Sequence, residues 1–174
     1  MKHFCIAVTG VVAALVAGVS SGAGVAHADA WSDEVLARHN HARENYGAPP
    51  LTWNSDLYAS TLQFARQCKF QASEAGGQYG ENLYAGTSST MGIHDAMRTW
   101  MNEGSKYNYS NPGLSAGTRH FTQVVWKSTT QVTAAIADCP AGTIYDQPSK
   151  FIVARYTPPG NLEGRFPQNV GRRV

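Results

Sequence analysis

Cysteine is scarce in this sequence, which contains only Cys5, Cys68 and Cys139. Cys5 lies in an N-terminal segment that we expect to be removed, so two cysteines remain. Two cysteines are too few for a disulfide-dense small domain or for a zinc module built on thiolates. The count allows at most one disulfide within the mature chain, between Cys68 and Cys139.

An excess of charge of one sign is also lacking. The chain has 14 Lys and Arg against 12 Asp and Glu, a formal net charge of +2, and no run of like charges. Proteins that bind nucleic acids or anionic membranes usually carry a clustered basic surface. The sequence therefore predicts no nucleic-acid partner.

Long hydrophobic runs are missing apart from residues 6–19, which are fewer than the roughly 20 that a membrane-spanning helix needs. This run follows a basic start and precedes small residues at the spacing that signal peptidase reads. We predict a secretory signal at residues 1–28, with cleavage after Ala28 or Ala30; a retained anchor is the alternative. Residues 31–174 are then one secreted domain with no transmembrane segment, large enough for a single core.

The spacing of apolar residues predicts mixed secondary structure. Helices are expected at residues 32–46, 55–68 and 90–103, the first with Ser32 as its N-cap. Strands are expected at residues 121–126, 132–137 and 151–156, a short extended segment at 51–53, and loops at 71–90 and 104–120. Helices come first and strands later, which favours an α+β fold with an antiparallel sheet.

The common catalytic motifs are absent: the sequence has no nucleophile elbow, no zinc-protease helix, no P-loop and no dinucleotide fingerprint. What remains is a set of polar residues next to aromatic ones, in six short segments. The segments are His39-Asn40 with Arg43, Pro50 to Trp53, Gly80 to Leu83, Trp100 with Glu103, His120 to Trp126, and Tyr156 to Asn161.

In type and order, these six segments resemble the CAP superfamily of cysteine-rich secretory, antigen five and pathogenesis-related class 1 proteins, also called the SCP domain. The resemblance extends over about residues 32 to 168 and is greatest to the fungal secreted branch. It implies a three-layer α-β-α sandwich with a central cleft. In structural terms, we expect His39, Asn40 and Arg43 to tie the first helix to neighbouring backbone, and we expect Trp53, Trp100 and Trp126 to belong to the core.

Family members line their cleft with two histidines and two glutamates that hold a divalent metal such as zinc. The resemblance places Glu81, Glu103 and His120 at three of these positions, but Ala72 stands where the first histidine belongs. A single imidazole with Glu81 and Glu103 binds zinc weakly. We therefore expect no resident cofactor, and at most weak divalent-metal binding at Glu81 and His120.

The same three residues have structural interpretations. Glu81 would accept hydrogen bonds that order its loop. Glu103 would bond either to Glu81 through a shared proton or to His120, and two close carboxylates would raise the pKa of one of them. No catalytic residue is assigned.

An aromatic-rich loop in some family members is linked to sterol binding, and Tyr107 and Tyr109 lie in the corresponding irregular segment. Exposed aromatic rings suit a flat apolar ligand, so Trp100, Tyr107 and Tyr109 are candidate lipid-binding residues. The alternative is that both tyrosines are ordinary loop residues. Asn108-Tyr109-Ser110 is also a glycosylation sequon in a secreted eukaryotic protein, with Asn108 as the acceptor.

The resemblance argues against the disulfide that the cysteine count allows. The family's usual cysteines would stand at Ala134 and Ala154, and position 139 lies about 17 Å along a strand from position 134. If Cys68 and Cys139 have each lost their usual partner, they are not expected to bridge one another.

Three functions remain open. The first is a secreted, non-enzymatic, monomeric protein that binds a small lipid, either a sterol or a fatty acid, in defence or host interaction. The second is a metal-assisted hydrolase or protease using Glu81, Glu103 and His120. The third is a protein ligand directed at an extracellular receptor.

Overall fold

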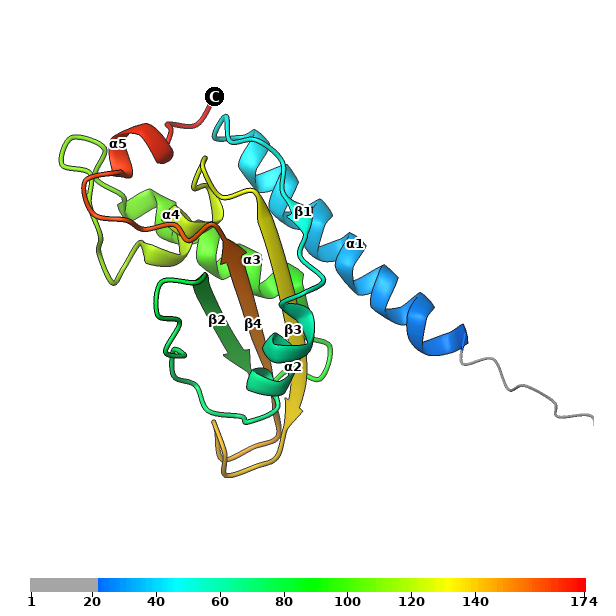
Figure 1. Ribbon diagram of the computed structural model, residues 1–174. Helices are drawn as coiled ribbons and strands as arrows, with labels where there is room; N and C mark the ends of the chain where they lie inside the picture. The colour runs from blue at the N-terminus through cyan, green and yellow to red at the C-terminus, as the bar shows by residue number, and fades with distance from the viewer. Residues whose placement is uncertain (1–21) are drawn as a thin grey trace, which may run out of the picture.

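An antiparallel pair of strands, β3 (Gln131–Cys139) and β4 (Ser149–Thr157), forms the centre of the fold (Figure 1). Strand β2 (Gly80–Gly86) pairs antiparallel with β4, and the two-residue β1 (Thr52–Trp53) pairs parallel with β3. The strand order is β1-β3-β4-β2. The computed structural model describes residues 22–174, and their side chains from residue 30 onward. The predicted signal at residues 1–28 lies mostly outside this range.

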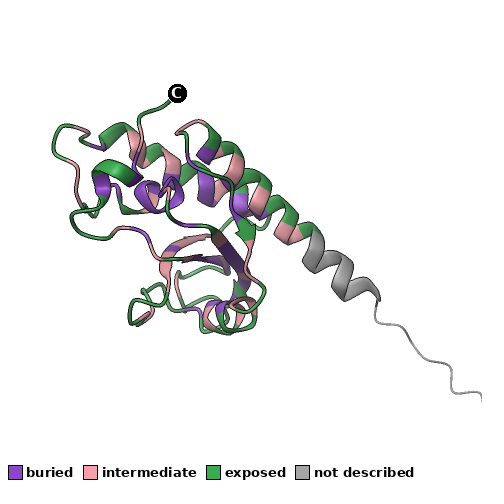
Figure 2. Ribbon diagram, turned by 45° about the horizontal axis from the view of Figure 1, so that its top comes forward, coloured by how far each residue is buried: buried purple, intermediate pink, exposed green. Residues whose placement is uncertain are grey.

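Helices cover both faces of the sheet. Helix α2 (Tyr58–Ala65) covers one face, while α1 (Gly22–Glu44), α3 (Ile93–Asn102) and α4 (Arg119–Val124) cover the other. A short 3₁₀ helix, η1 (Glu103–Lys106), continues α3, and α5 (Phe166–Asn169) lies near the C-terminus. The buried residues follow the two sides of the sheet (Figure 2). The predicted α-β-α sandwich is confirmed.

The central strands are apolar on both faces because each face is covered by helices. Ala134 and Val132 on β3 belong to the cluster under α1 and α3, whereas Ala135 and Ala137 belong to the cluster under α2. This alternation is the two-residue period of a strand. Trp100 and Trp126 are fully buried, as predicted, and Trp53 is half-buried.

The first helix begins ten residues earlier than predicted. Helix α1 starts at Gly22, so Ser32 lies inside it and is not its N-cap. The preceding residues 23–30 include four alanines, which favour helix more than any other residue. A residue that is favourable as an N-cap therefore does not mark the start of a helix when the residues before it also favour helix.

Two predictions in the middle of the chain are wrong. Residues 121–126 do not form a strand: they lie in and after helix α4, and all six are buried. A short, mostly apolar segment does not show whether it forms a buried helix or a strand. Residues 80–86 were expected to be a loop, but they form β2, because pairing with β4 outweighs the low strand propensity of this Gly-bounded segment.

The prediction against a Cys68–Cys139 disulfide is also wrong. The two cysteines are bonded, with their Cα atoms 5.5 Å apart. Cys139 has the opposite strand parity to Ala134, so it faces α2, and Cys68 lies just after that helix in the same core cluster. The distance along the strand was the wrong measure, because position 134 faces the opposite side of the sheet.

Arg43 ties α1 to the rest of the molecule, as predicted. Its guanidinium is fully buried and donates hydrogen bonds to four backbone carbonyls, of Pro49, Val124, Trp126 and Thr129, at 2.7–3.0 Å. Asn40 does the same for the segment after α1, since its side chain exchanges two hydrogen bonds with the backbone of Leu51. These contacts place α4 and the strand β1 relative to α1.

Candidate functional site

Glu81, at the start of β2, is held entirely by structural partners. Its carboxylate accepts hydrogen bonds from the backbone N–H and the hydroxyl of Ser73, both at 2.8 Å, and from Nε of Arg155 at 3.0 Å. The side chains of Glu81 and Arg155 are only 6% and 4% exposed. The structural interpretation, in which Glu81 orders the loop before it, is thus confirmed.

Arg155 is an internal cation that the sequence prediction missed. It lies on β4 directly opposite Glu81 in the strand register. Its guanidinium lies 4.3 Å from the centre of the Tyr79 ring and 5.1 Å from that of Phe64. The signal in the sequence was a single charge within the otherwise apolar run of residues 151–156, since a buried arginine requires a charged or polar partner.

Glu103 and His120 form the second part of the predicted cluster. Glu103 Oε1 lies 2.6 Å from Nδ1 of His120, and its other oxygen accepts the backbone N–H groups of His120 and Phe121. Burial alone would raise the pKa of Glu103, but these hydrogen bonds and the nearby imidazole outweigh it and lower the pKa. The expected raised carboxylate pKa is therefore wrong for Glu103.

The predicted cluster is divided by the sheet. Glu81 and Arg155 point toward α2, where Arg155 also donates to Ser60, while His120 stacks on Trp100 within the opposite layer. Glu103 is bonded to His120, and Glu81 is bonded to Arg155 and Ser73 instead of to Glu103. Among the residues that the structure describes, no hydrogen bond or ion pair joins Glu81 to Glu103 or His120.

The residues present do not fit the zinc ion that the resemblance implies. Ala72 offers no ligand, and the carboxylate of Glu81 is neutralised by Arg155. Among the residues that the structure describes, no group of three or more His, Cys, Asp or Glu side chains is arranged to hold a metal.

The candidate lipid-binding aromatics are less exposed than predicted. Trp100 is 1% exposed, with its indole N–H bonded to the backbone oxygen of Leu83, and Tyr107 is 7% exposed. The two tyrosine rings meet edge to face at 4.8 Å. The expectation of an exposed ring is therefore wrong for Tyr107, and Trp100 is the core residue that the sequence predicts. Tyr109 remains half-buried.

Tyr109 borders a hollow of about 670 Å³ between the end of α1, the end of α3 and the C-terminal segment. Tyr46 and Met101 supply the other large apolar side chains, and Arg172 and Arg173 supply positive charge. The guanidinium of Arg172 lies 4.7 Å from the centre of the Tyr109 ring. The sequence alone did not point to Arg172 and Arg173, because their place beside Tyr109 depends on the C-terminal segment folding back toward the end of α1.

Asn108 is exposed, and its side-chain oxygen accepts backbone hydrogen bonds from Ser110 and Asn111. Glycosylation there remains a prediction. No helix in the described part of the chain is both long and apolar enough to cross a membrane.

Comparison with known proteins agrees with this architecture. The model of the cysteine-rich secretory protein family, CAP, matches residues 36–156. The secreted protein RBT4 of Candida albicans is 36% identical over 144 residues, which is 79% of this chain but only 37% of that protein. Golgi-associated plant pathogenesis-related protein 1 of Homo sapiens is 37% identical over 148 residues, covering 80% of this chain and 92% of that protein.

Solved structures share the fold. A crystal structure of NaASP2 with Zn²⁺ matches with a TM-score of 0.67 at 20% identity, covering 82% of this chain and 86% of that one. Hookworm platelet inhibitor matches with a TM-score of 0.65 at 19% identity, covering 83% and 78%. The family model, the relatives and the shared fold agree, and the chain belongs to the cysteine-rich secretory protein (CAP) family.

Proposed function

We propose that this chain is a secreted, non-enzymatic protein that binds a small lipid in the hollow beside Tyr109. The observation that carries the proposal is the combination, in one hollow, of Tyr46, Met101 and Tyr109 with Arg172 and Arg173. An apolar wall with a charged rim suits a ligand with an apolar body and an acidic head. Of the two lipid classes, a fatty acid matches this site better than a sterol.

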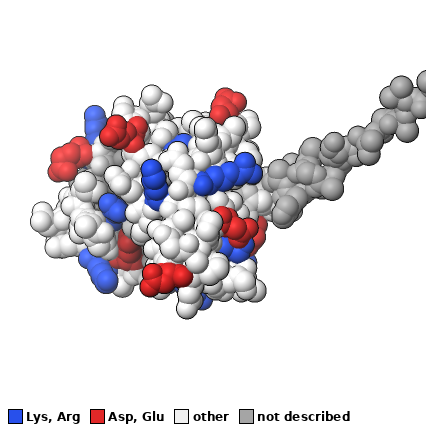
Figure 3. Space-filling model, turned by 90° about the horizontal axis from the view of Figure 1, so that it is seen from below, with Lys and Arg blue, Asp and Glu red and all other residues white. Residues whose placement is uncertain are grey.

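The surroundings of the hollow support this choice. The edge-to-face contact with Tyr107 fixes the ring of Tyr109, and Tyr107 in turn packs on Phe121 of the core. A fixed ring loses little freedom when a ligand covers it. Elsewhere, on the face in Figure 3, basic and acidic side chains are interspersed, so that face offers no patch of one sign to attract an acidic lipid.

Secretion is part of the same proposal. It rests on the apolar N-terminal segment of the sequence and on the similarity to RBT4, which is named as a secreted protein. Because this chain spans 37% of the length of RBT4, the role of the whole relative does not transfer directly. A defence or host-interaction role, an extracellular protein partner and a monomeric state are likewise proposed.

Binding of a fluorescent fatty acid and of a fluorescent sterol to the purified mature protein tests the proposal. We expect saturable fatty-acid binding, lost in Ser105→Trp, because the exposed Ser105 lines the hollow and an indole would fill it. The double variant Arg172→Gln, Arg173→Gln should lower the affinity for the fatty acid by about tenfold. Arg66→Gln, with Arg98→Gln, removes two exposed charges elsewhere and should leave binding unchanged.

Absence of saturable binding of either lipid at tens of micromolar would overturn the proposal. A different result would keep the site but change the ligand class. In that case the protein would bind the sterol, Ser105→Trp would abolish this binding, and the double arginine variant would leave it unchanged.

A metal-assisted hydrolase is the second candidate, and the Glu103–His120 pair is the observation that favours it. A carboxylate on Nδ1 orients an imidazole as a general base. Such an enzyme also needs an activated nucleophile or a metal-bound water, and the described residues do not arrange a metal site. Hydrolysis that persists in the purified protein and vanishes in both Glu103→Gln and His120→Ala would establish it.

A further inference from the structure

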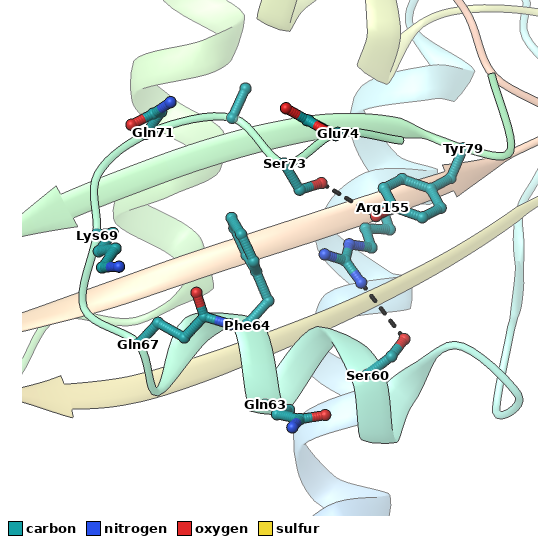
Figure 4. A pocket seen from close by; sticks show the side chains of 11 residues that line it. Ser60, Gln63, Phe64, Gln67, Lys69, Gln71, Ser73, Glu74, Tyr79 and Arg155 are labelled. Carbon is teal, nitrogen blue, oxygen red and sulfur yellow. Dashed lines mark hydrogen bonds between the residues drawn. The ribbon is translucent and has the colours of Figure 1, made fainter. Parts of the chain in front are cut away.

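A second hollow, of about 480 Å³, lies on the other side of the sheet, between α2 and the loop of residues 69–79 (Figure 4). Gln63 from α2, Gln67 just after this helix and Gln71 from the loop line it, and Arg155 on β4 reaches it from the sheet. This volume falls within the range of roughly 300–1,000 Å³ that is usual for small-molecule pockets. The hollow therefore has room for a small organic molecule.

Arg155 presents a fixed hydrogen-bonding fork to this hollow. A guanidinium carries five N–H donors, of which Nε serves Glu81 and Nη1 serves Ser60. Within the described part of the chain, Nη2 makes no hydrogen bond. The rings of Tyr79 and Phe64 hold the guanidinium from its faces. Free donors on an immobile, almost fully buried arginine match the two oxygens of a carboxylate.

The rest of the lining limits the kind of anion. Lys69 adds a positive charge, but Glu74 also lines the hollow, and Glu81 already offsets part of the charge of Arg155. This balance suits a single negative charge better than a phosphate dianion or a polyanion. The three glutamine amides both donate and accept hydrogen bonds, as a hydroxylated ligand requires.

We propose that this hollow, defined by Gln63, Gln67, Lys69 and Arg155, binds a small hydroxylated carboxylic acid of the hexuronic acid class. The carboxylate lies on the free donors of Arg155, with Lys69 nearby. The hydroxyl groups lie against the glutamine amides. The site is independent of the lipid hollow, because the sheet separates α2 from α3 and the C-terminal segment.

Titration of the ¹⁵N-labelled mature protein with glucuronate at low ionic strength tests this proposal. We expect saturable shifts of the Arg155 Nε–H resonance and of backbone amides in residues 63–73. Glucose, which has the hydroxyls but no carboxylate, should bind at least about tenfold more weakly. Equal shifts with glucose and glucuronate, or no saturable shift with glucuronate, would overturn the proposal.

Variants of exposed lining residues complete the test and leave the Glu81–Arg155 pair intact, since removing one member of a buried pair destabilises the fold. Gln67→Trp should fill the hollow and abolish glucuronate binding, and Lys69→Gln should weaken it several-fold. Lys106→Gln, an exposed lysine on η1, is the matched control and should change nothing. Unchanged binding in Gln67→Trp would place the ligand elsewhere.

The two proposed sites are distinguished by crossing the variants. Gln67→Trp should retain fatty-acid binding, and Ser105→Trp should retain glucuronate binding. Loss of glucuronate binding in Ser105→Trp would contradict a separate site under α2.

Discussion

His39 is a titratable residue that the fold encloses completely. It is 0% exposed, its Nδ1–H donates to the backbone oxygen of Val35 at 2.8 Å, and its Nε2 accepts from the Tyr156 hydroxyl at 2.9 Å. Both ring nitrogens are therefore satisfied by a neutral imidazole. Burial is the main cause that lowers the pKa of His39 from 6.5 to about 4.

This lowered pKa makes the stability of the protein depend on pH. In the unfolded chain His39 takes up its proton near pH 6.5, and in the folded chain only near pH 4. Above pH 6.5 His39 is neutral in both states, and the free energy of unfolding is not reduced by its protonation. As the pH falls from 6.5 toward 4, only the unfolded chain binds the proton, so the free energy of unfolding decreases by up to about 1.4 kcal/mol per pH unit. Urea unfolding at several pH values measures this slope.

His39→Gln should reduce that slope, although it also lowers stability at neutral pH. The exposed neighbour His41 provides the matched control, His41→Gln, which should keep the wild-type slope. The slope would be wrongly assigned to His39 if His39→Gln and the wild type lost stability equally between pH 6.5 and 4. The lowered pKa of Glu103 acts in the same direction at more acidic pH.

At the scale of elements, the packing of the segment after β4 onto α4 depends on one glycine. The N–H of Gly160 donates to Oε1 of Gln123 at 2.9 Å. A Cβ at position 160 would lie 2.7 Å from Nε2 of Gln123 and 2.9 Å from Cγ of Trp126. Trp126 is fully buried and has no room to move away.

Gly160→Ala is therefore expected to destabilise the protein by about 2 kcal/mol through overpacking. The midpoint of chemical unfolding measures this loss. Gly113→Ala is the control, because a Cβ there meets no atom within 4 Å, and it should stay within about 0.5 kcal/mol of the wild type. Equal midpoints for the two variants would show that the segment adjusts without cost.

Local sequence patterns predict some of the helices and strands correctly and others not. Helices α2 and α3 and strands β3 and β4 lie close to where their apolar spacing places them, because each buries a regular stripe or face. Strand β2 and helix α4 do not follow their local signals. The segment Gly80–Gly86 forms a strand because it pairs with the edge of β4. Phe121 to Trp126 is a short, wholly buried segment with four apolar residues and the polar Thr122 and Gln123, and so short a segment suits either type of element.

For the whole molecule, the Cys68–Cys139 disulfide links α2 to the far end of β3. The bond joins residues 71 positions apart in the chain. A crosslink of that span restricts the unfolded chain and adds about 4 kcal/mol to the free energy of unfolding in the chain-entropy model.

The double variant Cys68→Ala, Cys139→Ala should lose about 3–4 kcal/mol, measured by denaturant unfolding. A reductant should lower the stability of the wild type toward that of the double variant and leave the double variant unaffected. Titration of free thiols gives an independent check. Two reactive thiols in the unreduced, denatured mature protein would contradict the bond.

By itself, the sequence determined the α+β class, the family motifs, the buried tryptophans and the anchoring roles of Asn40 and Arg43, because these depend on residue type and local spacing. Only the tertiary structure decided that Glu81 pairs with Arg155 and that Cys68 reaches Cys139. Both outcomes depend on strand register and on which face each side chain occupies. A shift of one residue reverses that face, and it is set by contacts between segments far apart in the chain.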